Sequence, residues 1–329
     1  MIRRIVVPLD GTAFGEYAIP WAVAIARQAR ATIELVHVHV PHQHDHMSSI
    51  TPFAYEHAPD YDLVDDDEEL DAEMQWLIRR AQELRAETGL SILARTVRGR
   101  VGEALCEECA ALSADLVVMA THARGGFERV RLGSVGDTIV RQVSAPVLLI
   151  RPPDAEATPP TEPAFRRILV PLDGSAFSEQ VLPHVRELAR ATGAQPWLLH
   201  VVSPNLGASR RGSRNEEGTI EKRFRAGESY LEGVAAGLGE TTEPVLTTTL
   251  VDRLPAAAIR EASSDAQVDM IAIATHGRGG ISRLLLGSTG DEVVGNAGKP
   301  VLLYRPGVSD ELRDVFDVYG ESGSVETVV

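Results

Sequence analysis

The sequence predicts an α/β protein made of two copies of one doubly wound domain, each with a five-stranded parallel sheet. The first observation is an internal repeat: RRIVVPLDGTAFGE (3–16) and RRILVPLDGSAFSE (166–179) are identical at 11 of 14 positions. The second is the alternation of short apolar runs with stretches of helical periodicity. Apolar runs such as DLVVMA (115–120) and DMIAIA (269–274) are typical of parallel strands with helices on both faces.

The elements of the first copy can be justified in chain order. The opening run at 4–8 is short and apolar, as a buried strand should be. Helical spacing of Ala18, Ile19, Ala22, Ile25 and Ala26 predicts one helix at 13–30. Apolar runs then predict strands at 31–38, 91–97, 115–120 and 146–151, and helical periodicity predicts helices at 70–88, 101–112 and 134–143. The second copy repeats this order from 167 to 305.

Two further matches fix the extent of the repeat. Residues 120–137 and 274–291 are identical at 12 of 18 positions, and APVLLIRP (145–152) corresponds to KPVLLYRP (299–306). We therefore predict a first domain at 1–152, a linker rich in proline and acid at 153–164, a second domain at 165–307 and a C-terminal tail at 308–329.

The bulk composition narrows the function classes. The chain has 329 residues, is 44% hydrophobic and carries a net charge of −15, which disfavours binding to nucleic acid or to an anionic membrane. It has two cysteines and no apolar run of about 20 residues. The apolar run near the start is too short for a signal peptide. We expect a cytoplasmic protein.

The carboxyl ends of the strands are where a doubly wound sheet binds ligands. PLDG follows the first strand of each copy (8–11, 171–174), and THARGG or THGRGG follows the fourth. Gly-Ser then opens a helix, whose N-terminal amides suit phosphate, while the Asp can accept from a ribose hydroxyl or a base amine. This combination predicts a nucleotide site, although the P-loop, dinucleotide and nucleophile-elbow motifs are all missing.

The spacing Gly-x2-Gly-x9-Gly-[Ser/Thr] after the fourth strand, with Asp after the first, resembles the universal stress protein family over nearly the whole of both copies. The resemblance implies a Rossmann-like domain with strand order 3-2-1-4-5 and ATP as the bound cofactor. It leaves open whether ATP is bound with Mg²⁺, or whether another adenine nucleotide is preferred.

The resemblance also implies the site residues. In the second copy they are Pro171, Leu172, Asp173, Val201, Ile273, Ala274, Gly277, Arg278, Gly287, Ser288, Thr289 and Gly290. In the first copy they are Pro8, Leu9, Asp10, Val38, Met119, Ala120, Ala123, Gly133, Ser134, Val135 and Gly136. Both copies depart from the pattern, with Ala120 and Ala274 at its first glycine. We expect the second copy to be the better site, because Gly277 is replaced by Ala123 in the first.

Other conspicuous residues favour structural roles. His122 and His276 are expected to orient the loop after the fourth strand. The run VHVHVPHQHDH, with His37, His39, His42, His44 and His46, is expected to be an exposed loop and not a metal site. Cys106 and Cys109 are expected to pack within a helix, and the acidic run at 60–73 to be a solvated loop leading into a helix.

The last strands, PVLLIRP and PVLLYRP, should lie at a sheet edge, where the two copies can pair as an intrachain pseudo-dimer. Further association into a homodimer is left open. We expect a stress-response regulator in which nucleotide binding orders the loop at 278–286 and changes a surface offered to a protein partner that the sequence does not name. The alternatives are a nucleotide-free interaction scaffold and a slow ATP-hydrolysing enzyme. No residue stands out as a water-activating base, and a receiver domain would need an Asp after the third strand.

Overall fold

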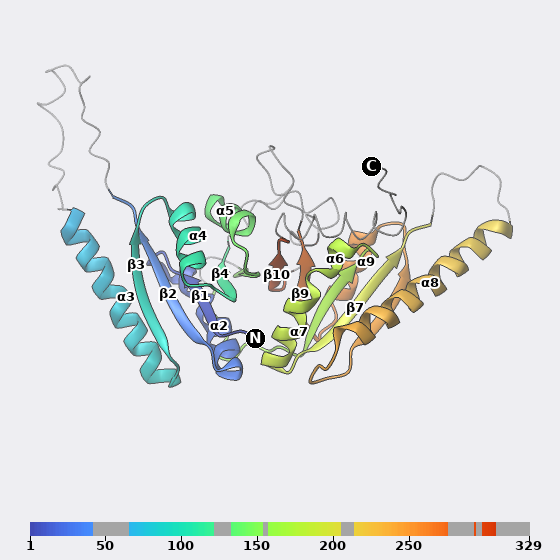
Figure 1. Ribbon diagram of the computed structural model, residues 1–329, viewed down its shortest axis with the longest axis horizontal. Helices are drawn as coiled ribbons and strands as arrows, with labels where there is room; N and C mark the ends of the chain where they lie inside the picture. The colour runs from blue at the N-terminus through green and yellow to red at the C-terminus, as the bar shows by residue number, and fades with distance from the viewer. Residues whose placement is uncertain are drawn as a thin grey trace, which may run out of the picture.

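A computed structural model of the chain describes residues 1–41, 66–121, 133–153, 157–204, 214–275, 293 and 298–306, with only the backbone at 66 and 214–217. It shows two α/β halves side by side, joined through their central strands, with the N-terminus between them (Figure 1). Within the described residues, every helix is too short or too polar to span a bilayer.

The first half follows the expected alternation of strands and helices. Its strands are β1 (Arg4–Pro8), β2 (Thr32–His39), β3 (Ile92–Arg98), β4 (Leu116–Ala120) and β5 (Val147–Ile150). Its helices are α1 (Ala13–Glu16), α2 (Ile19–Ala29), α3 (Asp66–Thr88), α4 (Val101–Ala111) and α5 (Ser134–Gln142).

The second half repeats the first. Its strands are β6 (Arg167–Leu172), β7 (Gln195–Val202), β8 (Leu246–Val251), β9 (Val268–Ala274) and β10 (Val301–Tyr304). Its described helices are α6 (Ala176–Glu179), α7 (Leu182–Thr192), α8 (Arg214–Leu238) and α9 (Pro255–Ser263).

All ten strands form one sheet in the order β3-β2-β1-β4-β5-β10-β9-β6-β7-β8. Each half therefore has the strand order 3-2-1-4-5 that the family resemblance implied, with parallel pairing within each half. The halves meet where β5 and β10 pair in antiparallel fashion, and Leu302 lies opposite Leu148 at the centre of this domain seam. The expected pairing of the last strands within one chain is confirmed.

One expected element is wrong. The helix predicted at 13–30 is two helices, α1 and α2, separated at Tyr17 and Ala18. Pro20 lies in the first turn of α2, where a missing amide and a fixed φ favour starting a helix over continuing one. The second half breaks in the same way before Pro183.

Side chains alternate between two cores on opposite faces of the sheet. Ile5 and Val7 of β1 join a core with α2 and α3 that continues through the domain seam into the second half, whereas Val6 faces α4 and α5. Helices α2 and α7 also pack against one another across the seam. Both cores include side chains of β10, such as Leu302 on one face and Val301 and Leu303 on the other, so the two halves are joined through buried side chains on both faces of the sheet.

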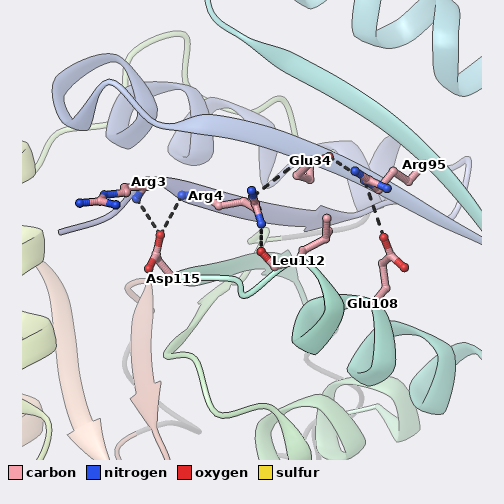
Figure 2. Close-up of polar contacts among 7 residues, drawn as sticks. All are labelled: Arg3, Arg4, Glu34, Arg95, Glu108, Leu112 and Asp115. Atoms are coloured by element: carbon pink, nitrogen blue, oxygen red, sulfur yellow. Dashed lines mark hydrogen bonds and ion pairs between the residues drawn. The ribbon is translucent and has the colours of Figure 1, made fainter.

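A charged ladder lies between the sheet and α4 in the first half (Figure 2). The carboxylate of Glu34 on β2 is 3% exposed and lies between Arg4 of β1, at 3.8 Å, and Arg95 of β3, at 3.0 Å. Arg95 also reaches Glu108 of α4, at 3.7 Å. In the second half, Trp197 takes the place of Glu34, so the same layer is built without a buried carboxylate.

Candidate functional site

The register of the strands brings the expected first-half residues to one edge. Val6 pairs with Val117 of β4, and Pro8 pairs with Val36 of β2. Continuing both registers places Asp10 level with Val38 and with Thr121. The ends of β1, β2 and β4 therefore meet at the carboxyl edge of the sheet, as the switch-point rule requires.

The second half brings together the equivalent set. Leu172 pairs with His200, and Leu169 pairs with Ile271, so Asp173 lies level with Val201 and with Thr275. Pro171 and Leu172 end β6, and Ile273 and Ala274 end β9. These are the residues expected to surround a nucleoside.

A tight turn holds each aspartate. Oδ1 of Asp173 accepts from the backbone amide and the hydroxyl of Ser175, at 2.9 and 2.5 Å. Oδ1 of Asp10 accepts in the same way from Thr12, at 3.0 and 2.6 Å. Thr12 and Ser175 in turn cap α1 and α6. The turn fixes one oxygen of each exposed carboxylate, and the second oxygen provides acceptor capacity for a ligand.

The hydrogen bonds around Asp173 also set its charge. Partial burial alone would raise the pKa of this carboxyl, but the bonds from Ser175 and Ser178 outweigh it and hold the pKa below its ordinary value. Asp173 is therefore ionised at neutral pH and acts only as an acceptor. In the first half Gly15 stands in place of Ser178, and a Cβ there would lie 2.4 Å from Oδ1 of Asp10.

The phosphate side of the site is described only in the first half. Gly133 precedes α5 with an extended backbone (φ −58°, ψ 162°) and makes no side-chain cap. Ser134, Val135 and Gly136 form the first turn, where backbone amides have no intrahelical acceptor and the helix dipole favours an anion. These amides and Asp10 are provided by segments that follow the adjacent strands β4 and β1.

Comparison with known proteins identifies the family. The model of the universal stress protein family matches residues 1–151 and again residues 164–305. The chain belongs to the universal stress protein family. A universal stress protein of Mycolicibacterium smegmatis is 28% identical over 313 residues, 92% of this chain and 97% of the relative. Universal stress protein Rv2005c of Mycobacterium tuberculosis is 26% identical over 308 residues, 92% of this chain and 96% of the relative.

A solved structure supports the fold over the same length. The universal stress protein of Archaeoglobus fulgidus superposes with a TM-score of 0.62 at 17% identity, covering 92% of this chain and 98% of that one. The tandem arrangement is thus shared with these universal stress proteins, because the alignments cover nearly the whole of both chains.

Several expected site residues of this universal stress protein lie outside the described residues. They are Ala123 of the first half, and Gly277, Arg278, Gly287, Ser288, Thr289 and Gly290 of the second, together with His122 and His276. The described members on the strands, including Met119 and Ala120 at the end of β4, lie at the carboxyl edge of the sheet.

The expectation of an exposed histidine loop is wrong for its first two members. His37 and His39 belong to β2 and are only 8% and 1% exposed, while His42, His44 and His46 lie outside the described residues. Strand alternation points both rings toward α3, where Glu73 meets them. In the part of the chain that the structure describes, no three His, Cys, Asp or Glu side chains are grouped as metal ligands would be.

The cysteines pack as expected. Cys109 is buried in α4, and burial raises its pKa to about 12. Cys106 is partly buried, and burial likewise raises the pKa of its thiol. High thiol pKa values oppose redox or nucleophilic chemistry at neutral pH.

Two features of the site were not predicted from the sequence. Thr121 and Thr275 directly follow the fourth strands and are buried level with the aspartates. His37 and His200 bond through Nδ1 to the carbonyl oxygens of Leu9 and Leu172, both at 2.8 Å, and so anchor the turns that carry the aspartates. The repeated His in the second strand of each copy was the available signal.

Proposed function

We propose that this universal stress protein binds an adenine nucleotide, ATP, with its better site in the second domain. The observation that carries the proposal is the ionised side chain of Asp173 at the carboxyl edge of the sheet. Ser175 donates hydrogen bonds to one of its oxygens, and the second oxygen can accept from a ligand. A ribose hydroxyl or an adenine amine would donate to it. Val201, Ile273 and Ala274 would line the nucleoside, and the loop from Gly277 to Gly290 would hold the phosphates.

The proposal includes a second, weaker nucleotide site in the first domain. Its Asp10 turn and the α5 amides reproduce the acceptor and the anion-binding donors. Ala123 stands where the second domain has Gly277, and a methyl group there would limit close approach of the ribose. ATP should therefore bind the two domains unequally.

Members of the family bind adenine nucleotides. One solved universal stress protein is in complex with cAMP, and one from Arabidopsis thaliana has AMP bound. Each matches less than half of this chain, so the proposal for this protein rests on its own residues.

The proposed role is regulation in the cytoplasm. Nucleotide binding would order the loop at 278–286 and present a changed surface to a protein partner. No residue of the sequence stands out as a water-activating base, so turnover should be slow at most. A nucleotide-free scaffold and a slow ATPase are the competing functions.

Thermal unfolding with ATP, ADP, AMP and GTP tests this proposal. Asp173→Asn keeps an acceptor oxygen for the Ser175 turn but replaces the second oxygen with a donor, and Asp10→Asn is the matched control in the first domain. Losing a hydrogen bond to a charged group costs about 1.5–3 kcal/mol, so ATP affinity should fall roughly 10–100-fold in Asp173→Asn. No stabilisation of the nucleotide-stripped wild type by any of these nucleotides would favour the scaffold.

A further inference from the structure

The turns that carry the two aspartates differ at one residue that changes their contacts. The turns have the sequences PLDGTAFGE and PLDGSAFSE, which differ at two positions. At the first position, Thr12 and Ser175 make the same hydrogen bonds, since each donates to its aspartate and each hydroxyl accepts from the backbone amide three residues on, at 3.1 Å. At the second position, Gly15 corresponds to Ser178, and only Ser178 has a side chain that can form new contacts.

The supports outside the two turns are alike. In each copy a histidine of the second strand bonds to the carbonyl oxygen that precedes the aspartate. Glu16 accepts from Nε of Arg80 on α3, at 2.9 Å, and Glu179 accepts from the hydroxyl of Tyr230 on α8, also at 2.9 Å. Each turn is therefore fastened both to the neighbouring strand and to a long helix. The difference between the turns lies inside them, at Ser178.

The hydroxyl of Ser178 links the two ends of its turn. It donates to the carbonyl oxygen of Ser175, at 2.9 Å, and accepts a longer bond from the backbone amide of Asp173, at 3.4 Å. Ser175 in turn donates to Oδ1 of Asp173. The backbone of the aspartate and one of its carboxylate oxygens are thus both held. An acceptor that is already held loses less conformational freedom when a ligand binds, so this turn is preorganised.

Gly15 leaves the equivalent space open, and Asp10 occupies it. A Cβ added at Gly15 would lie only 2.4 Å from Oδ1 and 3.3 Å from Cγ of Asp10. Non-bonded heavy atoms pack at about 3.5–4 Å, so the carboxylate of Asp10 lies where a side chain at this position would stand. In the second domain Ser178 fills that space. The carboxylate of Asp173 must therefore lie further from the start of α6 than that of Asp10 lies from α1.

We propose that Ser178 is a positioning residue for Asp173, and that the difference between Ser178 and Gly15 helps to make the second domain the better nucleotide site. Ser178 keeps the carboxylate out of the turn and holds the backbone that carries it, so the second oxygen of Asp173 faces the ribose hydroxyl or the adenine amine. Asp10, which lies against Gly15, would have to move to present its carboxylate in the same way. This inference rests on the proposed function.

Two substitutions separate the parts of this role. Ser178→Gly gives the second turn the residue of the first, whereas Ser178→Ala removes only the hydroxyl and keeps a residue that favours helix. Isothermal titration of ATP is done in an Ala123→Trp chain, so that the second domain reports. Loss of ordinary hydrogen bonds predicts that Ser178→Gly weakens ATP binding about 2–10-fold, and that Ser178→Ala weakens it less because the Cβ remains.

A double-mutant cycle asks whether Ser178 acts through Asp173. In an Asp173→Asn background the oxygen that Ser178 positions for the ligand is replaced by a donor, so Ser178→Gly should change ATP affinity by less than about twofold. A general loss of stability in the turn would instead weaken binding equally in both backgrounds. An equal loss with and without Asp173→Asn would therefore overturn the proposal.

Gly15→Ser is the reciprocal test in the first domain. Gly15 does not have a positive φ, so its backbone accepts a side chain once the carboxylate of Asp10 moves away. In a Gly277→Trp chain, where the first domain reports, this substitution should raise ATP affinity by a factor similar to the loss in Ser178→Gly. An unchanged or lower affinity would overturn the role assigned to this position.

Crystal structures without nucleotide separate this inference from the proposed function. In nucleotide-stripped Ser178→Gly, the carboxylate of Asp173 should move into the space left by the missing Cβ, as Asp10 lies against Gly15. A carboxylate in the same place as in the wild type would overturn the positioning role, whether or not ATP binds. If the carboxylate moves but the wild type binds no ATP, the positioning role is supported and the proposed function fails.

Discussion

Glu34→Ala is the sharpest test of how the first half is held together. The substitution removes the central carboxylate of the ladder in Figure 2 and leaves Arg95 and Arg4 without it. Removing one partner of a fully buried ion pair costs about 3–5 kcal/mol. The two arginine side chains are 44% and 41% exposed, however, so both can turn to water and regain solvation. We expect a smaller loss, of about 1–3 kcal/mol.

The assay is urea unfolding in the Trp197→Phe background, which isolates the two tryptophans of the first domain. Glu103→Ala is the control, because Glu103 is 60% exposed and pairs with Arg100 across one helical turn of α4. A surface pair of that kind contributes about 0.5 kcal/mol or less. If Glu34→Ala lowers the free energy of unfolding no more than the control does, burial of the Glu34 carboxylate does not strengthen its ion pairs. A decrease above about 5 kcal/mol would show that Arg4 and Arg95 do not turn to water when Glu34 is removed.

Three further predictions follow from the seam, the thiols and a buried histidine. Leu302→Asp places a charge in the buried seam and should lower the free energy of unfolding by several kcal/mol, whereas an unchanged free energy of unfolding would contradict the antiparallel pairing. The pKa of about 12 for Cys109, set by burial, predicts alkylation at pH 8 roughly 100-fold or more slower in the folded than in the unfolded chain. Burial lowers the pKa of His184 to about 4, so stability should fall as pH drops from about 6.5 to about 4.

The last two have direct checks. Equal alkylation rates in native and unfolded protein would show that Cys109 is accessible. For His184, the unfolded chain binds a proton below about pH 6.5, whereas the folded chain does not bind it until the pH approaches about 4, so acid favours unfolding. His184→Phe keeps a ring against Tyr304, whose centroid lies 4.0 Å from that of His184 with the planes tilted by 47°, and should remove this loss. An unchanged acid sensitivity would contradict the assignment.

The fold could be predicted because the sequence repeats its own pattern. Apolar runs such as DLVVMA fall on β4 and β9 within a residue, since strands buried on both faces need continuous apolar side chains. The break before Pro20 was missed because Ala18 and Ile19 continue the helical spacing across it. The helical spacing of apolar residues continues across the break, so it does not show that one helix ends there and another begins.

The site was predictable as far as it depends on topology. Asp10 and Asp173 had to reach the carboxyl edge once the strand order was known. The cluster of His37 with Glu73 could not be foreseen, because its members are 36 residues apart and meet only when α3 packs on β2. The burial of Glu34 in a β-strand was equally hidden, because its arginine partners come from two other strands.

Isothermal titration of ATP into the nucleotide-stripped chain, with Gly277→Trp and Ala123→Trp variants alongside, tests the central claim most directly. A tryptophan at either position would fill the space expected for the ribose of that domain. We expect tight binding that Gly277→Trp abolishes and Ala123→Trp leaves in place, with at most a weaker second site lost in Ala123→Trp. Absence of binding in a folded wild type, or tight binding that survives Gly277→Trp, would contradict a working site in the second domain.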